Sequence, residues 1–166
     1  MNITLNIIKN VISIYVENNK ILKDFYFGDI TRLTNENGSY QYPLLAVIPQ
    51  GTTVNRNGTD NKFNSITYNF NIIGADIVNG DDSNIDDILS DSIQNLSDFI
   101  SFLDGNVYFN EYNISLNGTN LTMNSFFERF SDVIAGHTMT IGIEVPWKYI
   151  DCDIPMDAFT YKDLDC

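Results

Sequence analysis

A helical repeat of apolar residues from Ser83 to Leu103 constrains the fold more than any other feature of the sequence. Its apolar side chains recur three and four positions apart, as one face of an amphipathic helix requires: Ile85, Ile88, Leu89, Ile93, Leu96, Ile100 and Leu103. Ser83 stands three positions before Asp86, as in a capping box, and Gly105 supplies a stop. The sequence therefore predicts a long helix whose apolar face needs a sheet or another helix to cover it.

The opposite face of this helix is acidic, because Asp87, Asp91 and Asp98 lie on it. The helix belongs to a longer stretch, between Lys62 and Arg129, that contains ten acids and no lysine or arginine. The first 60 residues balance five basic side chains against five acids, so the net charge of −13 comes from residues 61–166. Such a surface repels phosphate, which disfavours nucleic-acid binding and favours protein partners.

The N-terminal segment also has a helical pattern, with polar and apolar residues on separate sides. One narrow sector of this helix contains the polar residues Asn6, Lys9, Asn10, Ser13 and Glu17. Apolar residues fill the rest of the helix surface. We expect a helix buried on most sides, by its own domain or by a neighbouring subunit. The segment lacks the basic leader and cleavage site of a signal peptide, and no apolar run approaches the roughly 18 residues that span a bilayer. A soluble protein without a membrane partner is expected.

A first hairpin is predicted before the acidic helix. Leu44–Ile48 is an apolar run bracketed by prolines, and apolar residues alternate with polar ones from Ile66 to Ile72. The connection between them, Gln50–Asn64, is polar and contains several turn-forming residues. It is predicted to be a long mobile loop.

A second hairpin is predicted after the acidic helix. Val107–Leu116 has the composition of a strand, and after a turn at Asn117–Gly118 a further extended segment is expected at Leu121–Phe130. His137–Val145 then alternates in polarity after a tight turn expected at Ala135–Gly136. Together these patterns predict an α+β fold, in which an antiparallel sheet of two hairpins carries the N-terminal helix and the acidic helix on one face. Residues 1–150 are expected to form a single domain, followed by an acidic C-terminal tail at residues 151–166.

Few residues suggest catalytic or metal-binding chemistry. His137 is the single histidine and no nucleophile-elbow sequence accompanies it, so a structural role is expected. The oxygen-rich segment Asn79–Asp87 suggests calcium only weakly, because it lacks the ligand order of an EF-hand. Cys152 and Cys166 have no metal-binding spacing and are expected to be reduced thiols. The sequence thus predicts no enzyme, no cofactor and no metal site.

One tract of the sequence resembles a known family. Residues 126–155 read FFERFSDVIAGHTMTIGIEVPWKYIDCDIP, in which an aromatic segment leads through Ile-Ala-Gly into an alternating strand, a proline and a Cys-Asp-Ile-Pro tail. The tract is similar to the C-terminal part of neck and tail-completion proteins of tailed bacteriophages. The Tyr42–Pro49 segment, the Ile66–Asp76 strand and the acidic helix follow the same order as in that family. The richness in asparagine is associated with AT-rich genomes such as those of crAss-like phages.

The resemblance implies a tail terminator or head-tail connector adaptor. Such a protein is made in the bacterial cytoplasm, enters the virion as a hexameric or dodecameric ring, and contacts portal, adaptor or tail proteins. DNA would pass through the ring without specific binding, along a wall lined by Asp87, Asp91 and Asp98. Candidate inter-subunit contacts are these: Gln50, Gly51, Arg56, Trp147, Ile154 and Pro155. For Trp147 a place in the core or at its edge is favoured over an anchoring role. The alternative is a monomeric acidic protein-binding or inhibitory module.

Overall fold

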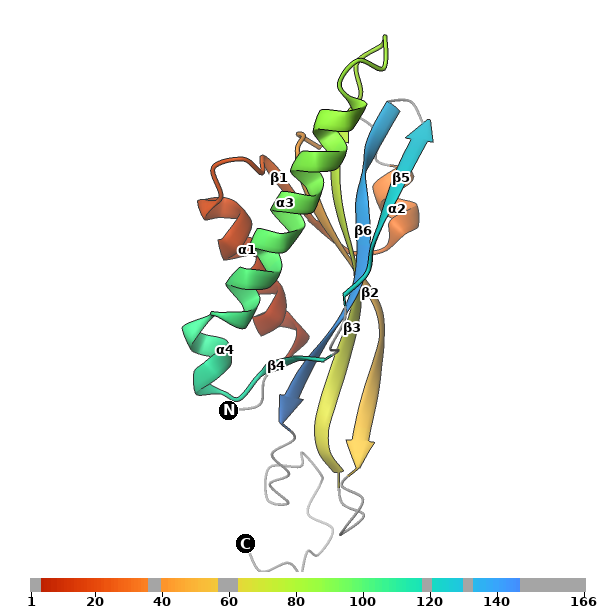
Figure 1. Ribbon diagram of the computed structural model, residues 1–166. Helices are drawn as coiled ribbons and strands as arrows, with labels where there is room; N and C mark the ends of the chain where they lie inside the picture. Colours follow the sequence, from red (N-terminus) through yellow and green to blue (C-terminus); the bar gives the residue numbers. More distant parts are fainter. Residues whose placement is uncertain (1–3, 36–39, 57–62, 118–120, 130–132, 147–166) are drawn as a thin grey trace, which may run out of the picture.

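The computed structural model describes residues 4–35, 40–56, 63–117, 121–129 and 133–146. Within these ranges the chain forms an α+β fold around one six-stranded sheet. Its elements in order are α1 (Leu5–Asn18), β1 (Asp24–Phe27), α2 (Ile30–Asn35), β2 (Leu44–Arg56), β3 (Phe63–Ile77), α3 (Ile85–Asp104), α4 (Val107–Glu111), β4 (Ser115–Asn117), β5 (Met123–Arg129) and β6 (Val133–Pro146). Helices α1, α3 and α4 lie on one side of the sheet, and α2 lies on the other (Figure 1).

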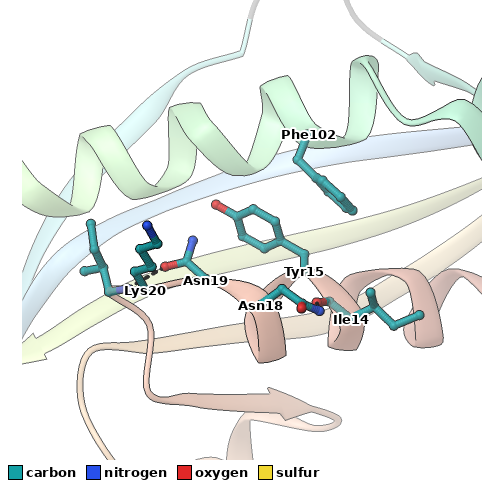
Figure 2. A pocket seen from close by; sticks show the side chains of 7 residues that line it. Ile14, Tyr15, Asn18, Asn19, Lys20 and Phe102 are labelled. Carbon is teal, nitrogen blue, oxygen red and sulfur yellow. Dashed lines mark hydrogen bonds between the residues drawn. The ribbon is translucent and has the colours of Figure 1, made fainter.

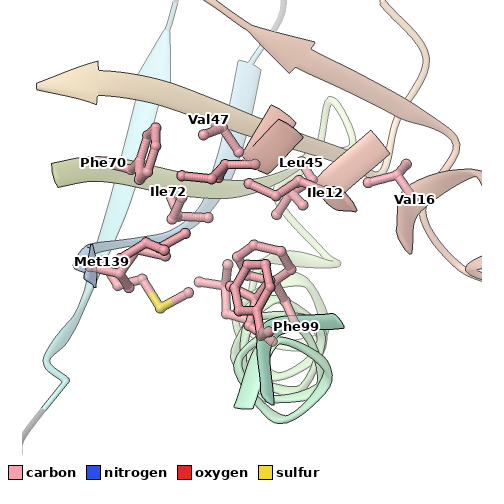
Figure 3. Packing of buried hydrophobic residues seen from close by; sticks show 14 of the residues in the cluster. Ile12, Val16, Leu45, Val47, Phe70, Ile72, Phe99 and Met139 are labelled. Carbon is pink, nitrogen blue, oxygen red and sulfur yellow. The ribbon is translucent and has the colours of Figure 1, made fainter. Parts of the chain in front are cut away.

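The two predicted helices are confirmed, and together they cover the main core. Ile8, Ile12 and Val16 of α1 are buried at intervals of four residues, while Leu96 and Phe99 of α3 are fully buried. These side chains pack against the inward residues of β2, β3 and β6, as Figure 3 shows for Leu45, Val47, Phe70, Ile72 and Met139. The sheet thus explains the spacing of Ile88, Leu96 and Leu103, whereas Ile93, also predicted on the apolar face, is 45% exposed.

The sheet is mixed, whereas an antiparallel sheet was predicted. Its strand order is β1-β2-β3-β6-β4, and β5 also pairs with β6. Asp24–Phe27 forms β1 and pairs in parallel with Leu44–Val47. Four residues carry too little local preference to specify a strand, so this pairing depends on contacts distant in the sequence. The remaining pairs are antiparallel.

A smaller apolar cluster lies on the second face of the sheet. It joins Tyr26 of β1 to alternate residues of β2 and β3, which are Leu44, Ala46, Ile48, Ile73 and Ala75. Three partly buried aromatic side chains pack against this cluster: Tyr40, Tyr42 and Phe126. The run Leu44–Ile48 is therefore continuously apolar because both faces of β2 are buried there.

The first hairpin is confirmed, but its strands are much longer than predicted. Residues 50–56 and 63–64, assigned by sequence to a mobile loop, are strand residues of β2 and β3. Pro49, expected to mark a strand end, lies inside β2 next to a register shift between Pro49 and Gly51. A proline is tolerated there because β1 ends its pairing at Val47, so none of the described strands on that edge needs the missing N–H group.

The second hairpin consists of β5 and β6, and its turn lies elsewhere than predicted. Met123 pairs with Met139 and Arg129 pairs with Val133, so the connection falls at residues 130–132, outside the described residues. Ala135 and Gly136, predicted to form the turn, are interior residues of β6. The first half of the predicted strand Val107–Leu116 is also wrong, because it forms helix α4. Asn106 caps that helix by accepting hydrogen bonds from the N–H groups of Tyr108 and Phe109.

Candidate functional site

The three predicted acidic residues of α3 lie together on its solvent face. Asp87, Asp91 and Asp98 are all exposed, and they follow one another at helical spacing along the outer side of the helix. Gln94 lies between them and donates a hydrogen bond of 2.8 Å to an oxygen of Asp98. The helix contains no lysine or arginine, so this row presents uncompensated negative charge to solvent.

The oxygen-rich segment before α3 uses its polar groups to shape the helix start. Asn84 accepts a hydrogen bond from the N–H of Asn79 and donates one to the carbonyl of Ile77. Asp81 accepts from the N–H of Ser83, and hydrogen bonds from the Ser83 hydroxyl and backbone lower the pKa of its carboxyl group. The helix starts at Ile85 with Asn84 as its N-cap residue, so the expected capping box at Ser83 and Asp86 is wrong.

The predicted inter-subunit residues fall into two groups. Gln50, Gly51 and Arg56 lie in β2 rather than in a loop, and all three are exposed. Trp147, Ile154 and Pro155 lie outside the described residues. Among the described strands, β1 alone pairs with the outer edge of β2, and it does so only at Leu44–Val47. The outer edge from Gln50 to Asn55 therefore has no strand beside it in the part of the chain that the structure describes.

A polar cluster missed by sequence reasoning connects three strands on the face away from α1 and α3. Asn55 donates to the hydroxyls of Ser65 (3.1 Å) and Thr67 (2.9 Å), and the Ser65 hydroxyl donates to Glu144 (2.5 Å). Ser65 and Thr67 are only 5% and 3% exposed. Buried hydroxyls need such partners, so the cluster holds β2, β3 and β6 in register. The polar positions of the alternating strand pattern were the available clue to it.

His137 forms a buried pair with Ser92 of α3. Its Nδ1 atom lies 2.8 Å from the Ser92 hydroxyl, which also donates to the carbonyl of Leu89 at 3.0 Å. The tautomer of the ring decides which of the two groups donates in this hydrogen bond. The pair therefore links α3 to β6 through a buried hydrogen bond.

The burial of His137 predicts that the protein loses stability in mildly acidic solution. Burial lowers the pKa of His137 below its ordinary value of 6.5, so the unfolded chain takes up a proton before the folded chain does. Stability is therefore fully present above the unfolded pKa and falls as the pH drops through about 6.5 toward the folded pKa, by at most about 1.4 kcal/mol per pH unit. Urea unfolding at several pH values between neutrality and pH 5 measures the slope. The His137→Gln variant should show a flatter profile in this range, and an equal slope in both proteins would contradict the assignment.

A shallow groove lies between the C-terminal half of α1 and α3. It has a volume of about 560 Å³ and is lined by Ile14, Tyr15, Asn18, Asn19, Lys20, Ile21 and Phe102 (Figure 2). We call it the α1–α3 groove. The sequence predicted α1 to be buried on most sides, but Ile14 is 54% exposed and Ile21, just after the helix, is 51% exposed. The described residues thus leave an apolar strip, formed by Ile14 of α1 and Ile21 after it, uncovered.

Tyr15 forms the centre of the groove. Its ring packs against Phe102 at a centroid distance of 4.8 Å and against Phe99 at 5.4 Å. Its hydroxyl oxygen is buried and accepts or donates no hydrogen bond, and it is the one such side-chain atom among the described residues. Burial raises the pKa of Tyr15, and the nearby negative charge of Asp98 raises it further. The Asn19 amide opposes this shift, although it does not reach hydrogen-bond geometry with the hydroxyl.

The chain matches no protein-family model and no curated protein. Among the described helices none has the length and apolar character needed to cross a bilayer. The described residues also contain no group of three or more His, Cys, Asp or Glu side chains arranged to hold a metal ion.

Proposed function

We propose that this chain is a structural subunit of a ring in the neck or tail of a tailed bacteriophage, acting as a tail terminator or head-tail connector adaptor. Its role in this proposal is mechanical, with no catalytic step. The resemblance of residues 126–155 to neck and tail-completion proteins motivates it. The β5–β6 hairpin carries most of that tract, from Phe126 to Pro146, and the α+β architecture is compatible with it.

The open outer edge of β2 is the observation on which a ring depends most. Gln50 to Val54 are exposed, and the described residues place no strand beside this part of the edge. An unpaired edge invites a strand from another chain, because its N–H and C=O groups then gain partners. If the added strand comes from a different surface of the next copy, the contact is heterologous and repeats until a ring closes. Gln50, Gly51 and Arg56 would then lie at the contact.

The acidic row on α3 fits a channel wall in this proposal. Asp87, Asp91 and Asp98 are exposed and lack basic neighbours on their helix. A wall of such side chains repels phosphate, so that DNA passes without binding. The chain would be made in the host cytoplasm and retained in the virion through contacts with itself and with portal, adaptor or tail proteins.

The ring is tested by the mass and image of the assembled protein. Light scattering on the purified chain should give many times the mass of one chain, and a particle reconstruction should show a closed hexamer or dodecamer. Val54→Lys adds a charge beside the open edge and should yield a folded monomer. Ile93→Lys places the same charge on exposed α3 and should leave the ring intact.

Two outcomes separate the parts of this proposal. A wild-type chain that stays monomeric and is absent from particles would refute the ring and favour a monomeric acidic module. A ring with Asp87, Asp91 and Asp98 on its outer wall would keep the assembly but rule out their role as channel lining.

A further inference from the structure

The α1–α3 groove combines exposed apolar walls with an unsatisfied polar group. Covering Ile14 and Ile21 with a partner's apolar side chain is favourable, because each exposes about half of its surface to water. The Tyr15 hydroxyl is buried without a hydrogen bond, which costs stability unless a partner or a rearranged neighbour satisfies it. Both features are typical of a surface that is completed by another molecule.

The groove lining contains no acidic residue, but exposed acids lie on both helices close to it. Asp98 lies one helical turn before Phe102 and near enough to Tyr15 to raise its pKa. Asp91 is exposed two turns earlier on the same helix face, and the exposed Glu17 lies one turn after Ile14 on α1. Lys20 is the one basic residue in the groove lining, and it lies beyond the end of α1. The apolar strip is thus bordered by acids on both helices.

We propose that the α1–α3 groove docks a basic amphipathic segment of another protein. An apolar side chain of that segment packs between Ile14, Ile21 and Phe102, and flanking lysines or arginines face Glu17, Asp91 and Asp98. Charge complementarity selects this occupant. Nucleic acid is repelled by the same acids, and a second copy brings a net charge of −13 toward an acidic border. The proposal does not require the chain to form a ring.

The test uses the full chain and a defined probe. The probe is a fluorescein-labelled peptide of roughly 18 residues, about five helical turns, with leucines on one helical face and lysines on the other. Fluorescence anisotropy in about 0.15 M salt measures its affinity where general charge attraction is screened. A control peptide of the same composition, shuffled to remove the apolar face, should bind at least about tenfold more weakly, a difference of about 1.4 kcal/mol.

Two pairs of variants locate the site. Ile14→Gln with Ile21→Gln removes apolar surface without changing charge, and Asp91→Asn with Asp98→Asn removes charge without changing the apolar walls. Each pair should weaken the probe at least about tenfold. The control for the apolar pair is Ile30→Gln with Ile77→Gln, because both isoleucines are exposed outside the groove. The control for the acidic pair is Asp86→Asn with Asp87→Asn, which removes the same charge from the first turn of α3. Both controls should change the affinity less than about twofold. Circular dichroism and thermal unfolding verify that each variant is folded.

Three results would overturn the proposal. Equal weakening by the groove variants and their controls means that the peptide is attracted by net charge alone. Absence of binding by the folded wild-type chain means that the groove does not accept this chemistry. Self-association that is lost in the Ile14 and Ile21 double variant, without peptide binding, assigns the groove to a second copy.

Discussion

Replacing Phe99 with alanine is expected to lower the free energy of unfolding by about 3 to 5 kcal/mol, the usual cost of emptying a buried phenylalanine site. Phe99 is fully buried on α3, its ring contacts Tyr15 of α1, and it packs on the sheet near Met139 and Ile72 (Figure 3). Its side chain therefore joins both helices to the strands. The loss is a large part of the roughly 5 to 15 kcal/mol by which a domain of this kind is stable.

Thermal and urea unfolding of wild type and Phe99→Ala measure this effect. For a chain of this length the melting temperature should fall by about 6 to 20 °C. Ile93→Ala is the matched control, because Ile93 lies on the same helix and is 45% exposed. It should change stability by less than about 1 kcal/mol. Equal losses in the two variants would mean that α3 does not pack on the sheet through Phe99.

The helices were predictable from the sequence because their apolar spacing is local information. The predicted helix from Ser83 to Leu103 corresponds to α3 at Ile85–Asp104, and Gly105 caps it as expected. Its acidic row was equally predictable, since the residues opposite an apolar face must meet solvent. Asp87, Asp91 and Asp98 are exposed for this reason.

The strands that were missed depend on distant partners. Thr52, Thr53 and Asn55 have no apolar alternation, yet they are strand residues because β3 pairs with them in register. Asp24–Phe27 becomes a strand only because Leu44–Val47 lies beside it. Val107–Glu111 was predicted to be a strand but forms a helix, because the Asn106 cap stabilises the helix despite β-forming residues. Tertiary contacts and caps outweigh propensity in such short segments.

The α1–α3 groove could not be predicted from the sequence for a related reason. Residues of α1 outside its narrow polar sector all look like core residues in the sequence. Which of them remain uncovered depends on where α3 crosses beside α1, and this leaves Ile14 exposed while Ile12 is fully buried. A sequence pattern gives the face of a helix, but the position of its neighbour decides how much of that face is covered.

Gly136 is expected to be the glycine least tolerant of substitution in the sheet, and Gly136→Ala should cost about 3 kcal/mol, at the upper end of overpacking penalties. The residue lies in β6 between two strands, where it pairs with Ala75 of β3 and Phe126 of β5. A Cβ atom added here would lie 1.9 Å from the carbonyl oxygen of Gly74. That oxygen belongs to the backbone and cannot rotate away, so β3 and β6 must separate locally.

Gly51→Ala is the matched control, and it should change stability in the opposite direction. Gly51 also lies in a strand, but nothing lies within 4 Å of the position its Cβ atom would occupy. Alanine there restricts the unfolded chain without a clash, so a gain of roughly 0.4 to 1 kcal/mol is expected. Urea unfolding of both variants beside wild type measures the two signs in one experiment. If Gly136→Ala is as stable as wild type, the close contact between β3 and β6 is absent in solution, because the sheet could not otherwise accommodate the methyl group.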